Sequence, residues 1–196
     1  AALIRDETER LGRITHSLLT GGSLPRLRVD LAAQLLPIVR RAQALVFAGA
    51  REGGPELSVD ESLEELAVAA DPDRLLQVLV NLLQNAVDAN REAGARRVWV
   101  SASRVGPGVE IIVEDEGVGL QPEIEGRLFE PFATTKPPGE GTGLGLYASY
   151  MLVQTMGGDL SIENRDPRGA SARVRLPAGS ETLANDAGVH NRAPYS

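Results

Sequence analysis

Five polar side chains share one face of an otherwise apolar helical segment, and two of them suit a hard cation. The five recur at the spacing of neighbouring helical turns and are Gln77, Asn81, Gln84, Asn85 and Asp88. A solvated face is the simpler interpretation, but such faces usually carry Lys and Glu, and Asn costs about 0.5 kcal/mol of helix propensity relative to Ala. The amide oxygens of Asn81 and Asn85 would suit Mg²⁺, which keeps several waters and bridges to phosphates.

A carboxylate follows the apolar positions of a predicted strand over residues 108–115. Alternation places Asp115 on the same face as Ile111 and Val113, so we expect it to be buried and to need a hydrogen-bond donor. That donor is either a backbone amide in the Gly117–Gly119 turn or the exocyclic amine of a purine. The residues alone leave both possibilities open.

A second glycine cluster, residues 141–145, opens a helix predicted over residues 142–156. A helix N-terminus with amides bared by glycine binds anions. The preceding segment, 132–141, is rich in Pro, Gly and Thr and contains Lys136, so we expect a loop. Two glycine clusters around a loop that carries a lysine favour a nucleotide site.

Other nucleotide motifs fit less well. Gly143-x-Gly145-x-x-Ala148 matches the dinucleotide fingerprint, but that fingerprint must follow a strand directly, and here a proline-rich loop precedes it. The sequence contains neither a Walker motif nor the VAIK, HRD and DFG set of eukaryotic-type kinases.

The elements that must position these groups have local signals. The clearest helix spans residues 72–92, with Asp71 as N-cap and Pro72 at its first position. A further helix is predicted over 29–46, with Asp30 as N-cap and a kink at Pro37. The predicted strands lie in residues 55–69 (one or two short strands), 96–104, 108–115, 159–164 and 170–176.

The two ends of the chain differ from the part between them. Residues 1–22 carry an apolar bundle seam that ends at Gly21-Gly22, and we interpret them as the end of a helical hairpin whose first half is missing from this chain. Residues 179–196 lack periodicity and are predicted to be a disordered tail. We therefore expect a fragment of a longer protein, with its main domain at residues 29–178.

Composition limits the partners. A net charge of -7 argues against a nucleic acid as partner. The absence of cysteine and the presence of only two histidines argue against thiolate or histidine-rich metal sites. No apolar run approaches membrane-spanning length. We expect a cytoplasmic fragment without membrane contact, within a full-length protein that a membrane could anchor.

Four ordered blocks carry a family resemblance. NLLQNAVDA (81–89), DEGVG (115–119), LFEPFATTK (128–136) and GTGLGLY (141–147) closely resemble the N, G1, F and G2 boxes of the catalytic domain of bacterial two-component sensor histidine kinases. The resemblance covers about residues 29–178 and is strongest to the subgroup of nitrogen and C4-dicarboxylate sensors. The segment ETERLGRITHSLL is similar to the second helix of that family's dimerisation and phosphoacceptor hairpin.

The resemblance implies the ATP-binding fold shared with gyrase, Hsp90 and MutL. This Bergerat-type fold is an α+β two-layer sandwich with a mixed β-sheet and helices on one face, here preceded by a helical stub. The implied cofactors are ATP and Mg²⁺. The implied partners are ATP or ADP, a histidine-bearing hairpin of the same or a partner kinase, a response regulator, and a second copy in a full-length homodimer.

The resemblance also implies residue roles. Asn85 would ligate Mg²⁺ with support from Asn81, Asp115 would accept from the adenine amine, and Lys136 would reach the phosphates. The catalytic set is Asn81, Asn85 and Lys136, with Asn85 as the metal ligand. The nucleotide-binding set is Asn85, Asp88, Asp115, Gly117, Gly119, Phe129, Phe132, Thr135, Lys136, Gly141, Thr142, Gly143, Leu144 and Gly145.

Two departures from the family pattern bear on activity. The phosphoacceptor box is absent, because His16 lies where the second hairpin helix is expected and HSLLTGG does not match that box. We therefore expect a protein-histidine kinase catalytic fragment without its own substrate histidine. ATPase relatives carry a glutamate at the position of Asn81, and an amide is a poor general base. A hydrolysing ATPase of the chaperone or repair type and a non-catalytic nucleotide sensor are the alternatives.

Overall fold

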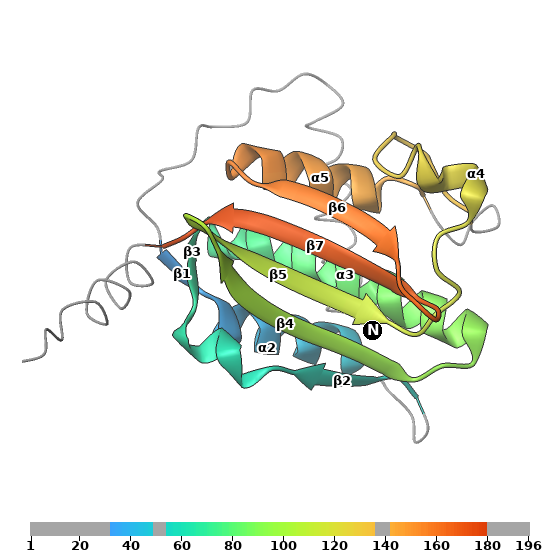
Figure 1. Cartoon of the computed structure of the whole chain (residues 1–196), viewed down its shortest axis with the longest axis horizontal. Helices are drawn as coiled ribbons and strands as arrows, with labels where there is room; N and C mark the ends of the chain where they lie inside the picture. The colour runs from blue at the N-terminus through green and yellow to red at the C-terminus, as the bar shows by residue number, and fades with distance from the viewer. Residues whose placement is uncertain (1–31, 49–53, 136–141, 180–196) are drawn as a thin grey trace, which may run out of the picture.

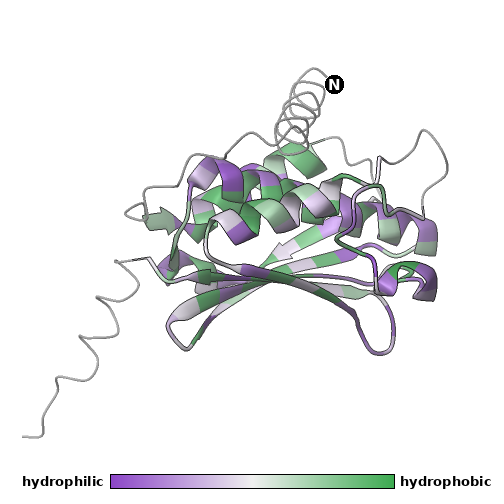
Figure 2. Cartoon of the chain, turned by 90° about the horizontal axis from the view of Figure 1, so that it is seen from above, coloured by the Kyte–Doolittle hydropathy of each residue, from purple (hydrophilic) through white to green (hydrophobic). Residues whose placement is uncertain are grey.

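The computed structural model describes residues 32–48, 54–135 and 142–179, which form two layers (Figure 1). One layer is a five-stranded mixed sheet, and the helices lie on one face of it (Figures 1 and 2). The two-layer sandwich predicted from the sequence is confirmed. The predicted helical stub, residues 1–22, and the predicted tail beyond residue 179 lie outside the described residues.

The sheet has the strand order β2-β4-β5-β7-β6, in which only β2 and β4 are parallel. Its strands are β2 (Glu56–Val59), β4 (Arg97–Val105), β5 (Gly108–Asp115), β6 (Asp159–Asn164) and β7 (Ala170–Pro177). The strands predicted at 96–104, 108–115, 159–164 and 170–176 are confirmed, and they pair as the hairpins β4–β5 and β6–β7. Hydrophobic and hydrophilic residues alternate along the strands (Figure 2), so one face packs under the helices.

Helix α3 (Pro72–Ala93) crosses the buried face of the sheet and lies at the centre of the core. Asp71 caps it by accepting from the backbone N–H groups of Asp73 and Arg74 at 2.9 and 3.1 Å. The helix ends at Gly94, whose φ of 68° is left-handed. The helix predicted from the capping signals is therefore confirmed nearly to the residue.

The opposite face of the sheet carries charge. Glu110 on β5 is only 6% exposed, and it pairs with Arg175 at 2.6 Å and Arg173 at 3.4 Å on β7. Arg173 also pairs with Glu163 on β6 at 2.9 Å. Because Glu110 has two oppositely charged partners on the neighbouring strand, a buried carboxylate is tolerated there.

The structure corrects the prediction for residues 29–46. Residues 32–34 form a short strand, β1 (Ala32–Gln34), which pairs with β3 (Ala67–Ala69). Helix α2 (Leu35–Phe47) begins after it with Gln34 as N-cap, whereas Asp30 lies outside the described residues. Pro37 is the third residue of α2, where its missing N–H costs no intrahelical hydrogen bond, so no kink is required.

Helix α5 (Gly145–Thr155) begins three residues later than predicted. Gly143 has a φ of 65°, a left-handed conformation that cannot continue into a right-handed helix. Thr142 Oγ1 accepts from the backbone N–H of Leu144 at 3.3 Å, a local turn that competes with helix. The other short elements are the 3₁₀ helix η1 (Glu61–Glu65) and helix α4 (Pro122–Glu125).

Candidate functional site

Asp115 ends strand β5 and is 5% exposed. Its Oδ1 accepts from two backbone N–H groups, that of Gly117 at 2.8 Å and that of Ala170 at 3.2 Å. No hydrogen bond to its Oδ2 comes from the described part of the chain. The carboxylate is thus held by backbone donors on one oxygen, and the other oxygen is left to accept from a ligand.

Burial raises the pKa of Asp115, and the neighbouring charge of Glu114 raises it further. The N–H groups of Gly117 and Ala170 and the charge of Arg165 oppose this rise. A buried carboxylate whose ionised form costs free energy is a feature of ligand sites more often than of cores.

Two glycines allow the loop after β5 to lie between α3 and the β6–β7 hairpin. A Cβ on Gly117 would lie 2.6 Å from the backbone carbon of Ala89 on α3. Gly119 has a φ of 74°, and a Cβ there would lie 2.6 Å from Oδ1 of Asn164. Side chains at either position would push the loop away from Asp115.

Asn81 on α3 contacts the start of α5. Its Nδ2 donates to Ser149 Oγ at 2.9 Å, and its Oδ1 touches the position that a Cβ of Gly145 would occupy. Gly145 is therefore required for the close approach of the two helices. Asn81 fixes the N-terminus of α5 against α3, and its amide nitrogen is already engaged.

The rest of the polar face divides into paired and unpaired groups. Gln84 Nε2 donates to Asp88 Oδ1 at 2.9 Å, and Asp88 lies 3.5 Å from Arg91. Gln77 is 4% exposed, so it belongs to the packed part of the helix. The half-buried Asn85 makes no hydrogen bond within the described residues, and its amide oxygen is available one turn from Asn81.

These residues fit a Mg²⁺ ion that takes most of its ligands from outside the protein. Within residues 32–48, 54–135 and 142–179 no group of three His, Cys, Asp or Glu side chains could hold a metal ion. A cation held by the single amide oxygen of Asn85 would need its other ligands from water and phosphate oxygens. Mg²⁺ is bound in this way more often than in an all-protein cage.

The segments on either side of residues 136–141 meet at Phe132 and Gly143. Phe132 N–H donates to the carbonyl of Gly143 at 3.0 Å. Both residues have positive φ values, 68° and 65°, and a Cβ on Gly143 would collide with the backbone of Phe132. The predicted ligands Lys136 and Gly141 lie outside the described residues, whereas Thr135 and Thr142 are exposed on either side of them.

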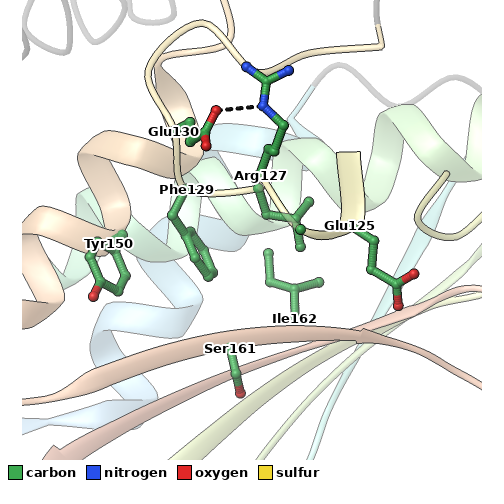
Figure 3. A pocket seen from close by; sticks show the side chains of 9 residues that line it. Glu125, Arg127, Phe129, Glu130, Tyr150, Ser161 and Ile162 are labelled. Atoms are coloured by element: carbon green, nitrogen blue, oxygen red, sulfur yellow. Dashed lines mark hydrogen bonds and ion pairs between the residues drawn. The ribbon is translucent and has the colours of Figure 1, made fainter. Parts of the chain in front are cut away.

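The two phenylalanines of the predicted set have different surroundings. Phe129 is half-buried and stacks on Tyr150 of α5 with ring centroids 4.9 Å apart, whereas Phe132 is 65% exposed. Phe129 and Tyr150 line a hollow of about 370 Å³ that also includes Ser161 and Ile162 of β6 (Figure 3). Its lining does not include Asp115, so this hollow is separate from the polar site.

Sequence reasoning missed three residues that hold the site together. Asn90 is fully buried, donates to the carbonyl of Arg97 at 2.9 Å and accepts from Glu116 N–H at 3.1 Å. The propensity argument applied to Asn81 and Asn85 would also have identified Asn90. Asn164 and Arg165 contact the loop after β5 from the β6–β7 turn, and no local signal predicts contacts so distant along the chain.

Comparisons with known proteins agree on one region. Residues 70–180, which contain all four sequence blocks, match the family model described as histidine kinase-, DNA gyrase B-, and HSP90-like ATPase. The two-component sensor PprA of Pseudomonas aeruginosa is 42% identical over 148 residues, which are 73% of this chain and 16% of PprA. The C4-dicarboxylate transport sensor protein DctB of the same organism is 37% identical over 182 residues, 92% of this chain and 30% of DctB. The full-length structure of ShkA in complex with AMPPNP matches with a TM-score of 0.67 and 26% identity, over 90% of this chain and 35% of ShkA.

The chain therefore spans well under half the length of the curated relatives that it matches. The expected resemblance to C4-dicarboxylate sensors is confirmed by DctB. Among the described residues, no helix has the length and apolar character needed to span a membrane.

Proposed function

Since the chain belongs to the family of histidine kinase-, DNA gyrase B- and HSP90-like ATPases and corresponds to the catalytic ATP-binding domain of sensor histidine kinases, we propose that it binds Mg-ATP and transfers the γ-phosphoryl group to a histidine. In this reaction the bond from the γ-phosphorus to the ADP oxygen breaks and a bond to an imidazole nitrogen forms. The acceptor histidine lies on a hairpin domain, and the phosphoryl group then passes to a response regulator.

The proposal rests on the surroundings of the Asp115 carboxylate. It is 5% exposed, its Oδ1 is occupied by two backbone donors, and its Oδ2 is left for a donor from outside the described chain. The exocyclic amine of adenine is such a donor, whereas the 6-oxo group of guanine is an acceptor and would be repelled. Adenine is therefore the base that this site would select.

The remaining groups are proposed to hold the triphosphate. Asn85 would ligate Mg²⁺, which supplies charge neutralisation at the phosphates when bound. The amides at the start of α5, from Gly143 to Gly145, would approach the phosphates, and Lys136 would reach them from residues 136–141. Catalysis of phosphoryl transfer is mostly positioning and charge stabilisation, so no protein nucleophile is required.

Asn81 favours transfer over hydrolysis. A hydrolytic enzyme needs a base that takes a proton from water, and Asn81 is an amide whose nitrogen already donates to Ser149 Oγ at 2.9 Å. We propose that Asn81 is instead a positioning residue between α3 and α5. A homodimer of the full-length protein would present the hairpin of one copy to this domain.

Calorimetric titration tests the proposal most directly. The chain would be titrated with ADP and with a non-hydrolysable ATP analogue, each with and without Mg²⁺, and with GDP as the matched control ligand. We expect one-site binding of both adenine nucleotides that Mg²⁺ strengthens, and at least tenfold weaker binding of GDP. Equal binding of ADP and GDP would refute adenine recognition by Asp115, and no binding of either would refute the nucleotide site.

A further inference from the structure

The turn between β6 and β7 lies beside the loop that follows β5 (Figure 1). Three contacts join the two segments. The first comes from Asn164, the last residue of β6. Its Oδ1 accepts from Leu120 N–H at 2.6 Å and its Nδ2 donates to the Leu120 carbonyl at 3.3 Å. One side chain thus satisfies both backbone groups of Leu120, five residues beyond Asp115.

The second contact comes from Arg165. Its Nη1 donates to the backbone carbonyl of Asp115 at 2.8 Å, and its Nε lies 3.1 Å from Glu114 Oε1. The guanidinium also lies 5.1 Å from the ring centroid of Trp99 on β4. Its side chain is 26% exposed, and three groups on two strands determine where the guanidinium lies.

The third contact is made by the backbone at the start of β7. Ala170 N–H donates to Asp115 Oδ1 at 3.2 Å. Gly169, with a φ of 97°, lies so close to the Asp115 carbonyl that a Cβ would overlap its oxygen. The turn itself is closed by Arg165 N–H, which donates to the Gly169 carbonyl at 2.9 Å.

We propose that the β6–β7 turn, residues 164–170, is a clamp that orients Asp115 for adenine, with Asn164 and Arg165 as positioning residues. The inference rests on the proposed function, because it deepens the role assigned to Asp115. Neither side chain touches the ligand. Arg165 holds the backbone from which Asp115 projects, and Asn164 holds the far end of the same loop.

Asn90 on α3 also holds the start of the loop by accepting from Glu116 N–H at 3.1 Å, and the physical reason for a further clamp is that two glycines follow this contact. Gly117 and Gly119 bring conformational freedom that ordinary residues lack. A hydrogen bond from the adenine amine to Asp115 depends on placement of Oδ2 within a few tenths of an ångström, and a site gains such placement from rigid neighbours. The clamp supplies side-chain and backbone contacts on both sides of the two glycines.

The test compares three variants of the whole chain for ADP affinity by calorimetry. Arg165→Met keeps an unbranched side chain over Trp99 and removes the guanidinium, and Asn164→Ala removes the contact to Leu120. Arg168→Met is the matched control, because Arg168 lies exposed in the same turn and the structure gives it no hydrogen bond or ion pair among the described residues. We expect about tenfold weaker ADP binding for each clamp variant and less than a twofold change for the control.

A pH profile separates positioning from general damage. Adenine recognition needs Asp115 ionised, so ADP affinity falls as the pH drops through the pKa of Asp115. Arg165 lowers that pKa and Glu114 raises it, whereas α3 and β4 present the uncharged Ala89, Asn90 and Val98 to this end of β5. We therefore expect Arg165→Met to move the acid limb of the ADP affinity profile to higher pH, and Asn164→Ala to weaken binding without moving it.

Each outcome decides between the two proposals. If the parent chain binds ADP but Arg165→Met and Asn164→Ala bind as well as Arg168→Met, the clamp is wrong and the nucleotide site stands. A parent that does not bind ADP overturns the proposed function and the clamp together.

If Arg165→Met does not fold, as judged by its thermal unfolding, Arg165→Lys replaces it. That variant keeps the charge but cannot reach Asp115 and Glu114 together, so it should weaken ADP binding with an unmoved acid limb. Unchanged affinity in Arg165→Lys would overturn the clamp.

Discussion

At the scale of one residue, the ligand-binding role proposed for Asp115 conflicts with its effect on stability. Its carboxylate is buried, and burial raises its pKa above the ordinary value of 3.8. A carboxyl group with a raised folded-state pKa contributes stability below its unfolded pKa and loses that stability as the pH rises through the folded pKa. At neutral pH the ionised Asp115 therefore lowers the free energy of unfolding.

Asp115→Asn should separate these two effects. The amide keeps an oxygen that can accept from Gly117 and Ala170 but carries no charge, and it offers a donor where adenine requires an acceptor. We expect the variant to unfold at a higher temperature than the parent at pH 7, with a difference that shrinks as the pH falls towards about 4. We also expect at least tenfold weaker ADP binding.

The control neutralises a neighbouring carboxylate, Glu116→Gln, and should leave both the unfolding temperature and ADP affinity nearly unchanged. Unaltered ADP affinity in Asp115→Asn would show that Asp115 does not accept from adenine. A lower unfolding temperature at pH 7 would show that the ionised carboxylate stabilises the fold through its backbone donors.

Asn85→Ala tests the magnesium ligand. The amide of Asn85 makes no hydrogen bond with the described residues, so its removal should change the free energy of unfolding by less than about 0.5 kcal/mol. We expect calorimetry to show that Mg²⁺ no longer tightens binding of the ATP analogue. Gln84→Ala, on the adjacent exposed position of α3, should retain the full effect of Mg²⁺. Equal Mg²⁺ dependence in Asn85→Ala and the parent would remove Asn85 from the metal site.

At the scale of elements, α3 connects the core to the site. Its apolar residues pack against the sheet, whereas three of its polar residues have different roles. Asn81 donates to Ser149 on α5, Asn85 is the proposed metal ligand, and Asn90 joins β4 to the loop after β5. A shift of α3 would therefore change both the proposed base site at Asp115 and the proposed phosphate site at the start of α5.

Asn90→Ala should show how far this connection stabilises the fold. Asn90 is fully buried, and its loss leaves the carbonyl of Arg97 and the N–H of Glu116 without their partner. We expect the free energy of unfolding to fall by roughly 2 kcal/mol, measured by urea denaturation at pH 7. Asn85→Ala is the matched control on the same helix. A loss below about 0.5 kcal/mol for Asn90→Ala would mean that water replaces the amide at little cost.

At the scale of the whole molecule, the sequence was informative where the signals are local. The cap at Asp71 and the alternation up to Asp115 are short-range features, and both the helix and the strand were predicted from them. Strand β1 was missed because its partner, β3, is more than thirty residues away and three residues show no period. The contacts of Asn164 and Arg165 were missed for the same reason, since they exist only once β6 and β7 return beside β5.

Phosphoryl transfer by the whole molecule is a prediction separate from nucleotide binding at its site. The chain would be incubated with Mg-ATP labelled at the γ-phosphate, with and without an isolated hairpin domain that carries a histidine. We expect label on the hairpin only when both proteins are present, and label that is stable in alkali but lost in acid, because it is held by a phosphorus–nitrogen bond to imidazole. ADP should form in step with the labelled hairpin, since Asn81 is an amide that donates to Ser149 and provides no base for water.

ADP release that far exceeds labelling would favour a hydrolytic ATPase. Tight ATP binding without labelling of any histidine-bearing hairpin would favour a nucleotide sensor. If the chain is a histidine kinase, a His→Gln change in the hairpin must abolish the label.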